Sequence, residues 1–286
     1  MKKMLCAFVF VSMAALLFAE PKYEPAGPGE DRVVRIPNMK QLDNGILEVN
    51  DYTFAFNLLP AIDMPQTVRN IKYAAFRNNN LTSVTIPENV VNIGGWAFAY
   101  NQLTQVIIPQ YVTVIGQGAF SDNKLQTIAL PKHIQAIEYS TFANNSLTEI
   151  TVPSEVRSVA GKAFMNNNLE SVSLPNALEY IGDEAFANNR LTNIVIPANV
   201  TYIGNYAFKN NRITSITLPE SCKRLGKYIF SNNQIRKITI GSSVQIDEWT
   251  FGQSFYRYYN GLNKQAGTYV LKGDTWVKTP DSGNFF

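Results

Sequence analysis

The chain has 286 residues, of which 45% are hydrophobic, and carries 25 basic and 22 acidic side chains for a formal net charge of +3. This composition is that of a globular protein rather than a disordered one, and the low net charge argues against a nucleic-acid-binding protein. The charge is unevenly distributed, since residues 20–199 contain 12 basic and 17 acidic side chains, whereas residues 200–286 contain 11 and 5. The last third of the chain is therefore basic.

Residues 1–19 have the pattern of a secretory signal peptide. Two lysines precede an apolar run from Met4 to Phe18, and the small residue Ala19 follows it. The run is too short for a good membrane span. We expect cleavage after this segment; an uncleaved anchor is the alternative, because Leu17 is larger than the residue usually found three positions before the cut.

The next segments predict a spacer and a cap. Residues 20–31 are polar and contain proline and glycine, which favours a flexible spacer. Residues 32–53 include "LDNGIL", with the Asn-Gly pair of a tight hairpin, followed by the back half of a repeat unit. We expect residues 32–53 to cap the first coil.

A phenylalanine recurs at a fixed interval through the middle of the chain. The interval is 22 residues from Phe54 to Phe230, and Phe251 follows 21 residues later. A fixed period of this length predicts a repeat architecture, in which each unit buries its apolar edge by stacking on the next. Residues 54–251 should therefore form one solenoid with a spine of stacked rings, built on Phe54, Phe76, Phe98, Phe120, Phe142, Phe164, Phe186, Phe208, Phe230 and Phe251.

Each repeat position, counted from the phenylalanine as zero, has its own residue type. Aliphatic residues at eight and ten predict a short strand with one face inward, and the proline that follows at eleven in eight units ends that strand. A second apolar pair stands at fourteen and seventeen, often with glycine at eighteen. We expect these glycines to adopt positive φ at a reversal, although Glu138 and Ala160 at the same position show that this conformation is not obligatory.

Asparagine stands three residues after the phenylalanine in all nine units that share the 22-residue spacing. The inward backbone groups of a tight bend lack strand partners, and an asparagine side chain offers both donors and an acceptor to adjacent coils. A structural ladder is therefore a better interpretation than a ligand site. The ladder residues are Asn57, Asn79, Asn101, Asn123, Asn145, Asn167, Asn189, Asn211 and Asn233.

Residues 252–286 follow the last repeat and predict a C-terminal cap. They contain the aromatic stretch "SFYRYY" and the segment "GTYVLKGDTWV", which has the pattern of two strands around a Gly-Asp turn. Such a hairpin would close the last coil and cover its open edge.

The segment "NRLTNIVIPANVTYIGNYAF", residues 189–208, resembles the leucine-rich repeat of the BspA-like, or treponemal-type, bacterial surface antigens. The resemblance extends over about residues 46–251. It implies an α/β-type, strand-rich solenoid that is right-handed and curved, with a parallel sheet on the concave face. It implies no catalytic residues.

The residues that could support catalysis do not form a recognisable site. His133 is the one histidine and follows Pro131 in a turn, where no repeat unit provides a nucleophile or a cluster of carboxylates. Cys222 occupies position fourteen, where other units place aliphatic residues, which indicates a core thiol rather than a reactive one. No metal-ligand spacing and no phosphate-binding glycine loop is present. We expect no enzyme activity, no cofactor and no metal.

The outward strand positions, seven and nine, form the broad face on which repeat proteins of this shape usually bind. This face is rich in hydroxyl groups and nearly uncharged, so it either keeps a curved sheet soluble or contacts a protein or glycan through hydrogen bonds. Its residues are Ser83, Thr85, Gln105, Ile107, Thr127, Glu149, Thr151, Ser171, Ser173, Asn193, Val195, Ser215, Thr217, Lys237 and Thr239.

Two further surfaces are predicted near the C-terminal end. Lys223, Arg224 and Lys227 form a candidate basic patch, or alternatively are solvated side chains on several faces. Tyrosines at positions sixteen and twenty predict an exposed aromatic patch; the alternative is that they pack against "SFYRYY". These tyrosines are Tyr180, Tyr202, Tyr206 and Tyr228.

Together these features predict an exported, non-enzymatic recognition protein. The resemblance favours an adhesin that binds a host protein, the extracellular matrix or a glycan, located on the cell surface, in the medium or in the periplasm. No nucleic-acid partner and no transmembrane segment after signal cleavage are expected. The alternative is a periplasmic scaffold or envelope assembly partner.

Overall fold

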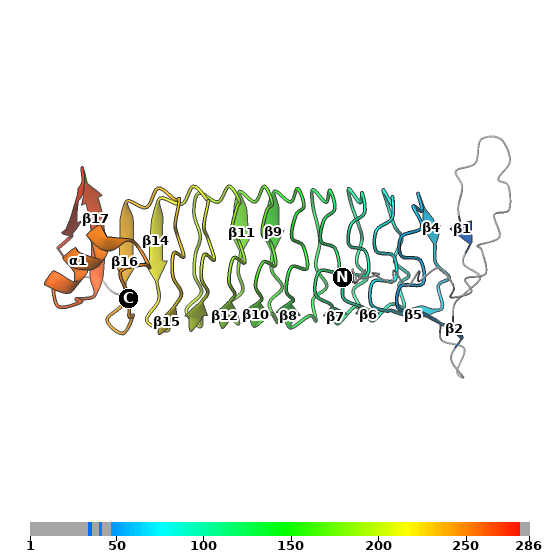
Figure 1. The fold of residues 1–286 in the computed structure, drawn as a ribbon. Helices are drawn as coiled ribbons and strands as arrows, with labels where there is room; N and C mark the ends of the chain where they lie inside the picture. Colours follow the sequence, from blue (N-terminus) through cyan, green and yellow to red (C-terminus); the bar gives the residue numbers. More distant parts are fainter. Residues whose placement is uncertain (1–33, 36–39, 42–46, 281–286) are drawn as a thin grey trace, which may run out of the picture.

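The computed structural model describes residues 34–35, 40–41 and 47–280. The predicted signal peptide and the predicted spacer, residues 1–19 and 20–31, lie outside the described residues. Figure 1 shows coils stacked side by side along one axis, and from Phe54 to Phe230 each coil spans 22 residues. The predicted fold is confirmed, since the chain forms a strand-rich solenoid of about nine turns with parallel sheets.

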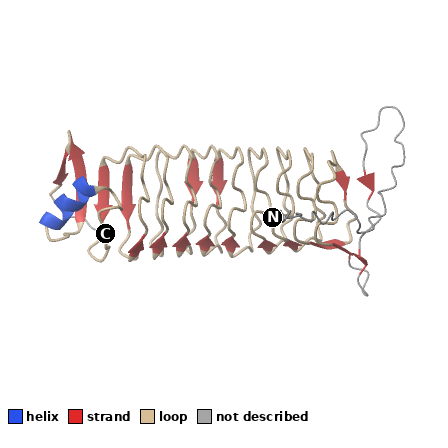
Figure 2. Cartoon of the chain, in the orientation of Figure 1, coloured by secondary structure: helices blue, strands red, loops and turns tan. Residues whose placement is uncertain are grey.

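The more regular row of strands lies at positions sixteen and seventeen, along the lower side of Figures 1 and 2. Each strand pairs in parallel with the strand one coil away, in register with the 22-residue period. The sequence did not predict this row and showed it only as a second apolar pair. The strands are β5 (Val68–Ile71), β6 (Asn92–Ile93), β7 (Val114–Ile115), β8 (Ala136–Ile137), β10 (Ser158–Val159), β12 (Tyr180–Ile181), β13 (Tyr202–Ile203) and β15 (Arg224–Leu225).

The predicted strands at positions seven to ten form the second row, along the upper side of Figure 1. In the second and third coils this row is reduced to a parallel bridge between Thr85 and Ile107. In β9 the middle residue is buried and its two neighbours are exposed, which is the alternation that the sequence predicted. The strands of the second row are β4 (Ile62–Asp63), β9 (Glu149–Thr151), β11 (Ser171–Ser173), β14 (Ser215–Leu218) and β16 (Lys237–Ile240).

The recurring phenylalanines form the predicted spine. Neighbouring rings are nearly parallel, and their centroids are 5.2 Å apart at the closest pair, Phe76 and Phe98, and 5.8 Å apart at the widest, Phe120 and Phe142. The rings from Phe76 to Phe208 are fully buried. Each ring therefore packs on the coil before it and the coil after it, and the core is continuous along the stack.

The glycines at position eighteen are required by close backbone contact rather than by a left-handed conformation. A Cβ atom on Gly182 would lie 2.4 Å from the backbone nitrogen of Gly161, and one on Gly226 would lie 2.4 Å from that of Asn205. Neither glycine has positive φ. The expectation of a positive-φ reversal at these glycines is thus wrong, because what limits the side chain is the preceding coil.

Positive φ occurs instead two residues before and two residues after each recurring phenylalanine from Phe54 to Phe230. Around Phe142 these residues are Ser140, with φ of 54°, and Asn144, with φ of 57°. A left-handed residue other than glycine costs about 1–2 kcal/mol. Backbone hydrogen bonds to the next coil offset this cost, since the N–H groups of Ser140, Phe142 and Asn144 all donate to carbonyls one coil further on.

The C-terminal end closes with a helix and a hairpin. Helix α1 (Gln253–Gly261) was not predicted, whereas the two strands around Gly-Asp are present as β17 (Gly267–Lys272) and β18 (Thr275–Lys278). β17 pairs antiparallel with β16 and so extends the second row of strands. Phe255 of α1 packs edge-on against Tyr269 and Trp276. In the described part of the chain, no helix is long and apolar enough to cross a membrane.

Short strands also cover the first coil. β2 (Lys40–Gln41) and β3 (Leu47–Val49) run antiparallel on either side of the predicted "LDNGIL" turn, most of which lies outside the described residues. β3 also pairs in parallel with β5, and β1 (Val34–Arg35) pairs in parallel with β4.

Candidate functional site

The residues predicted at positions seven and nine lie along the second row of strands, and we call this surface the Ser/Thr face. All of them are exposed except Ser215 and Thr239, which are half-buried. Ile107 and Val195 project from it with 81% and 73% of their surface exposed. At the C-terminal end β17 pairs with β16, and the hydroxyl groups of Thr239 and Thr268 are 3.0 Å apart. The face is therefore open along the stack and ends at β17.

A shallow hollow of about 600 Å³ lies at one edge of the Ser/Thr face, between the coils of Phe120 and Phe142. Thr127, Glu149 and Thr151 line it together with His133. The Nδ1 atom of His133 lies 3.0 Å from Oε1 of Glu155, and both side chains are exposed. The hollow thus offers hydroxyl groups and one exposed histidine–glutamate contact at its rim.

A second exposed surface follows position sixteen, on the first row of strands. Tyr180, Tyr202 and Arg224 are paired in register on β12, β13 and β15, and we call them the Tyr/Arg column. The two tyrosine rings stack with centroids 4.8 Å apart and planes inclined by 6°, and the guanidinium carbon of Arg224 lies 5.5 Å from the Tyr202 ring. The sequence predicted an aromatic patch but not the arginine that continues it.

Charge and burial act together on Tyr202. Burial raises the pKa of its hydroxyl, and the nearby Asp183 carboxylate raises it further through its charge and a hydrogen bond, while Arg224 acts in the opposite direction. Asp183 also accepts hydrogen bonds from the backbone and side chain of Asn205. Tyr202 therefore stays protonated at neutral pH and keeps its ability to donate a hydrogen bond.

The structure brings together two of the three residues of the predicted basic patch. Lys223 and Arg224 line a hollow of about 490 Å³ with Tyr180, Thr201 and Tyr202. Lys227 is exposed but lies at position nineteen, outside this hollow. Part of the basic patch and part of the aromatic patch therefore form one surface, which the sequence had treated as two.

The remaining predicted tyrosines form a separate row at position twenty. Tyr206 and Tyr228 stack with centroids 5.3 Å apart, and Trp249 continues the row at 5.4 Å from Tyr228. Lys209 places its ammonium group 4.9 Å from the Tyr206 ring. The rings of α1 contact Phe251 and residues of the terminal hairpin instead, so packing against "SFYRYY" does not account for these tyrosines.

The asparagines at position three lie inside the corner of each coil. In a typical case, Asn145 accepts a hydrogen bond from the Leu125 N–H at 3.0 Å and donates to the carbonyls of Phe120 at 2.9 Å and Phe142 at 3.2 Å. The carboxamide thus joins its own coil to the preceding one. Asn57 differs because it stands in the first coil and is exposed, and its side chain donates to the Ala55 carbonyl and to no other residue that the structure describes.

A second asparagine row, which the sequence did not single out, runs outside the first at position two. Side chains there hydrogen bond from coil to coil, with Asn166 donating to Asn144, Asn188 to Asn166 and Asn232 to Asn210. The same residues have positive φ, which asparagine tolerates better than most residues. The recurring Asn-Asn pair in the sequence was the signal for this row.

Cys222 lies in the core, where its position in the repeat predicted it. Its side chain is fully buried and donates a hydrogen bond from Sγ to the Val200 carbonyl at 3.2 Å. Burial raises the pKa of the thiol to about 12. Within the described residues no group of histidine, cysteine and acidic side chains is arranged to hold a metal ion.

This arrangement of short coils, parallel strands and asparagine corners defines a leucine-rich repeat solenoid. The model of the BspA type leucine-rich repeat region matches residues 47–170 and 135–258, in 6 copies. The chain belongs to this family. A comparison with curated protein sequences finds no match.

This chain is similar to solved structures of bacterial proteins, and one of them, with a TM-score above 0.5, shows the shared fold. A leucine-rich repeat protein from Bacteroides ovatus matches with a TM-score of 0.58 and 22% identity, over 74% of this chain and 70% of that one. A leucine-rich cell surface protein from Faecalibacterium prausnitzii matches with a TM-score of 0.46 and 23% identity, over 76% and 71% of the two chains. The pneumococcal vaccine antigen PcpA matches with a TM-score of 0.49 and 20% identity, over 69% of this chain and 60% of that one.

Proposed function

We propose that the protein is exported and works by recognition, as an adhesin that binds a host protein, a matrix component or a glycan. The observation that carries this proposal is the Tyr/Arg column, in which the exposed Tyr180 ring stacks on the half-buried Tyr202 ring and the Arg224 guanidinium group continues the stack, with Lys223 beside it. Tyrosine and arginine are the residue types enriched where interfaces gain most of their affinity.

The column suits binding because its side chains are already held in place. Stacked rings lose little conformational freedom when a partner covers them, so less of the interaction energy is spent on ordering. One face of the Arg224 guanidinium group lies near the Tyr202 ring, and the N–H donors at its edge can bind a carboxylate or sulfate. An acidic protein surface or an anionic glycan fits this chemistry.

The Ser/Thr face is the second candidate contact surface. Its exposed Ile107 and Val195 give it apolar points among hydroxyl groups. Such a face would bind through side-chain and water-mediated hydrogen bonds, with little dependence on salt. Binding at the Tyr/Arg column should therefore weaken as ionic strength rises, whereas binding at the Ser/Thr face should change little.

The test is binding of the purified protein to matrix proteins and to a heparin-like polymer across a salt series. The variants are Lys223, Arg224 and Lys227 changed together to glutamine, and Tyr180 and Tyr202 changed together to serine. Each should weaken binding about tenfold or more, which corresponds to a loss of about 1.4 kcal/mol. Raising salt towards physiological strength should weaken the contact further.

The matched control changes Thr127 and Thr151 on the Ser/Thr face to alanine. Binding that is lost in this control and kept in the other two variants would transfer the contact to the Ser/Thr face. If neither salt nor the change of Lys223, Arg224 and Lys227 to glutamine weakened binding, the electrostatic part of the proposal would be contradicted.

Export is tested by protease treatment of intact cells. Digestion of the protein would support a position on the cell surface. Protection of the protein until the envelope is opened would favour the alternative role as a periplasmic scaffold or envelope assembly partner.

A further inference from the structure

The last regular corner of the solenoid, between Phe230 and Ile235, lacks the partners that every earlier corner has. In the coil before it, the N–H of Asn210 donates to the Ser231 carbonyl at 2.9 Å, and the N–H of Ile213 donates to Oδ1 of Asn233 at 2.9 Å. The corresponding N–H groups of Asn232 and Ile235 have no acceptor within hydrogen-bond distance in the part of the chain that the structure describes.

Two acceptors at this corner are also missing a donor. The Phe208 carbonyl accepts from Asn211 of its own coil and from Asn233 of the next, whereas the Phe230 carbonyl accepts only from Asn233 among the described residues. Oδ1 of Asn210 accepts from Asn232 at 2.6 Å, whereas Oδ1 of Asn232, at the end of the row, receives no such bond from any described residue.

The cause is the departure of the chain at Gly252. Phe251 still stacks on Phe230 with centroids 5.5 Å apart, but Gly252 has φ of 88° and the chain then enters α1. The Gly252 carbonyl, which would have accepted from Asn232, accepts instead from Tyr256 in the helix. Position three of this last unit is Ser254, so no asparagine is available for the corner.

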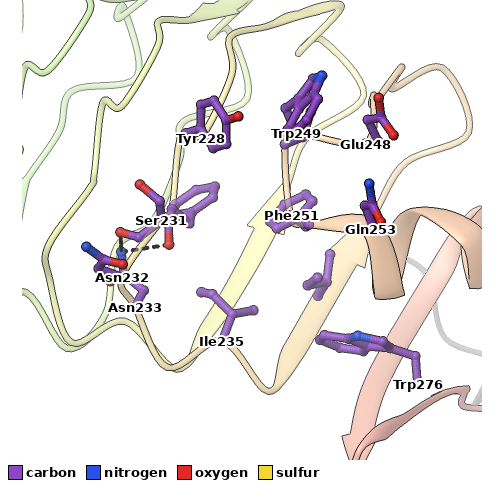
Figure 3. Close-up of a pocket in the computed structure, with 14 residues that line it drawn as sticks. Tyr228, Ser231, Asn232, Asn233, Ile235, Glu248, Trp249, Phe251, Gln253 and Trp276 are labelled. Carbon is purple, nitrogen blue, oxygen red and sulfur yellow. Dashed lines mark hydrogen bonds between the residues drawn. The ribbon is translucent and has the colours of Figure 1, made fainter.

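A pocket of about 430 Å³ opens where the next corner would have been. Figure 3 shows Asn232, Asn233 and Ile235 on one wall and Trp249, Phe251 and Trp276 facing them across the pocket. The Ser231 Oγ, on the same wall, is buried and has no hydrogen-bond partner within the part of the chain that is described. The size and the mixture of aromatic walls with a few polar groups are typical of ligand sites.

We infer that this pocket binds an extended peptide segment that carries the sequence Asn-Asn, supplied by another protein. The first asparagine of the peptide continues the outer row by donating to Oδ1 of Asn232. The carboxamide of the second accepts from the N–H of Ile235 and donates to the Phe230 carbonyl. The carbonyl two residues before the second asparagine accepts from the N–H of Asn232. All these bonds have counterparts one coil earlier.

The hydrogen-bond pattern makes the pocket selective for asparagine at the second position. An aspartate offers acceptors but no donor to the Phe230 carbonyl, and it would bring a negative charge next to Glu248, which also lines the pocket. A leucine of similar volume would leave the Ile235 N–H unpaired and the Phe230 carbonyl with its bond from Asn233 but without a second donor. Discrimination against either residue should be about tenfold or more, because each leaves a polar group without its partner.

The experiment titrates the full chain with acetyl-Ala-Asn-Asn-Ala N-methylamide and with matched peptides that have Asp or Leu at the third position. Both ends of each peptide are blocked without creating a primary amide. Any primary amide that the pocket recognises therefore belongs to an asparagine side chain. Tryptophan fluorescence and the backbone amide resonances of Asn232 and Ile235 report binding. We expect the Asn peptide to shift both resonances and to bind at least about tenfold more tightly than the other two.

The protein variants are Trp249→Ala, which removes a pocket wall, and Trp96→Ala, which removes a tryptophan from a coil near the other end of the stack. Trp249→Ala should weaken binding of the Asn peptide about tenfold, and Trp96→Ala should leave it unchanged. Equal binding of the three peptides, an equal effect of the two variants, or no shift at millimolar peptide would overturn the inference.

One competing occupant is the end of the chain itself, which contains Asn284. The titration is therefore repeated on the full chain with Asn284→Ala. Equal affinity in both proteins supports a partner from another protein. Binding that appears only after this change would overturn that choice of occupant and assign the pocket to the C-terminal residues of the same chain.

Discussion

The coil of Phe142 and the coil of Phe230 share the same sequence pattern but not the same surroundings. Phe142 stacks on rings at 5.8 Å and 5.6 Å on its two sides, and its corner exchanges hydrogen bonds with both neighbouring coils. Among the described residues, the corner at Phe230 exchanges hydrogen bonds with the coil before it but, apart from one bond from Tyr228 to Trp249, with none after it. The difference teaches that a unit of this fold is stabilised by its interfaces rather than by its own residues.

The largest test of this comparison removes a ring of the spine. Phe142→Ala in the middle should destabilise the protein by about 3–5 kcal/mol, since Phe142 is fully buried. Phe251→Ala, at a half-buried ring near the end, should cost much less. Thermal unfolding of both variants measures the difference. Small, equal shifts in melting temperature would show that the spine does not carry the stability of the stack.

The asparagine corner gives the next largest effect. Asn145→Ala leaves the Leu125 N–H and the Phe120 carbonyl short of a partner, at a cost of about 1–3 kcal/mol for a buried group. Asn57→Ala is the control, because that side chain is exposed and makes a single bond, so we expect a change within about 0.5 kcal/mol. Denaturant unfolding compares the two. A similar loss in both would mean that the corner bonds between coils contribute little.

Close approach of the coils is tested at position eighteen. Gly182→Ala would place a Cβ 2.4 Å from the Gly161 nitrogen, so the coils must separate locally, at a cost of about 1–3 kcal/mol. Gly261→Ala at the end of α1 meets no atom within 4 Å and should be neutral or slightly stabilising. If Gly182→Ala proved as harmless as Gly261→Ala, the contact between coils would not be the reason for the glycine.

The smallest effect is expected at Cys222. Other units place valine at this position, so Cys222→Val should change stability by less than about 1.5 kcal/mol. A thiol reagent should label the native protein only after denaturant is added, since the thiol is fully buried and burial raises its pKa to about 12. Rapid labelling of the folded protein would place Cys222 on the surface.

The same thiol gives a pH dependence with a defined sign. Its pKa in the folded protein lies above that of an unfolded cysteine, so its contribution to stability is present below about pH 8.5 and is lost as the pH rises towards the folded value. Unfolding measured from pH 8 to pH 11 should therefore favour Cys222→Val increasingly over the natural protein. A stability difference that stays constant over this range would contradict the raised pKa.

The sequence predicted those parts of the fold that every coil repeats. The phenylalanine period gave the spine, and the alternation at positions eight and ten gave a row of strands, because burial at a fixed interval leaves a visible pattern of residue types. The left-handed residues before each phenylalanine left no such pattern. Tyrosine, serine, lysine and glutamate all stand there, since hydrogen bonds to the next coil compensate the strain for any side chain.

The candidate sites were less predictable, because they depend on which side chains meet across coils. Tyr180, Tyr202 and Arg224 are 22 residues apart, so the period placed them in one column, but it did not show that the arginine would stack. The terminal pocket depends on the turn at Gly252 and on α1, and a single glycine after a long repeat does not reveal where the chain goes next.

The repeated corner also determines how the molecule would respond to a pulling force. From the coil of Phe54 to that of Phe230, each coil is held to the next by the same set of corner bonds, so no single coil is an obvious weak point inside the stack. Pulled from its ends, the chain should unravel inward one coil at a time. Each step would release 22 residues, which span about 75 Å when extended. A force trace of evenly spaced steps would therefore count the coils.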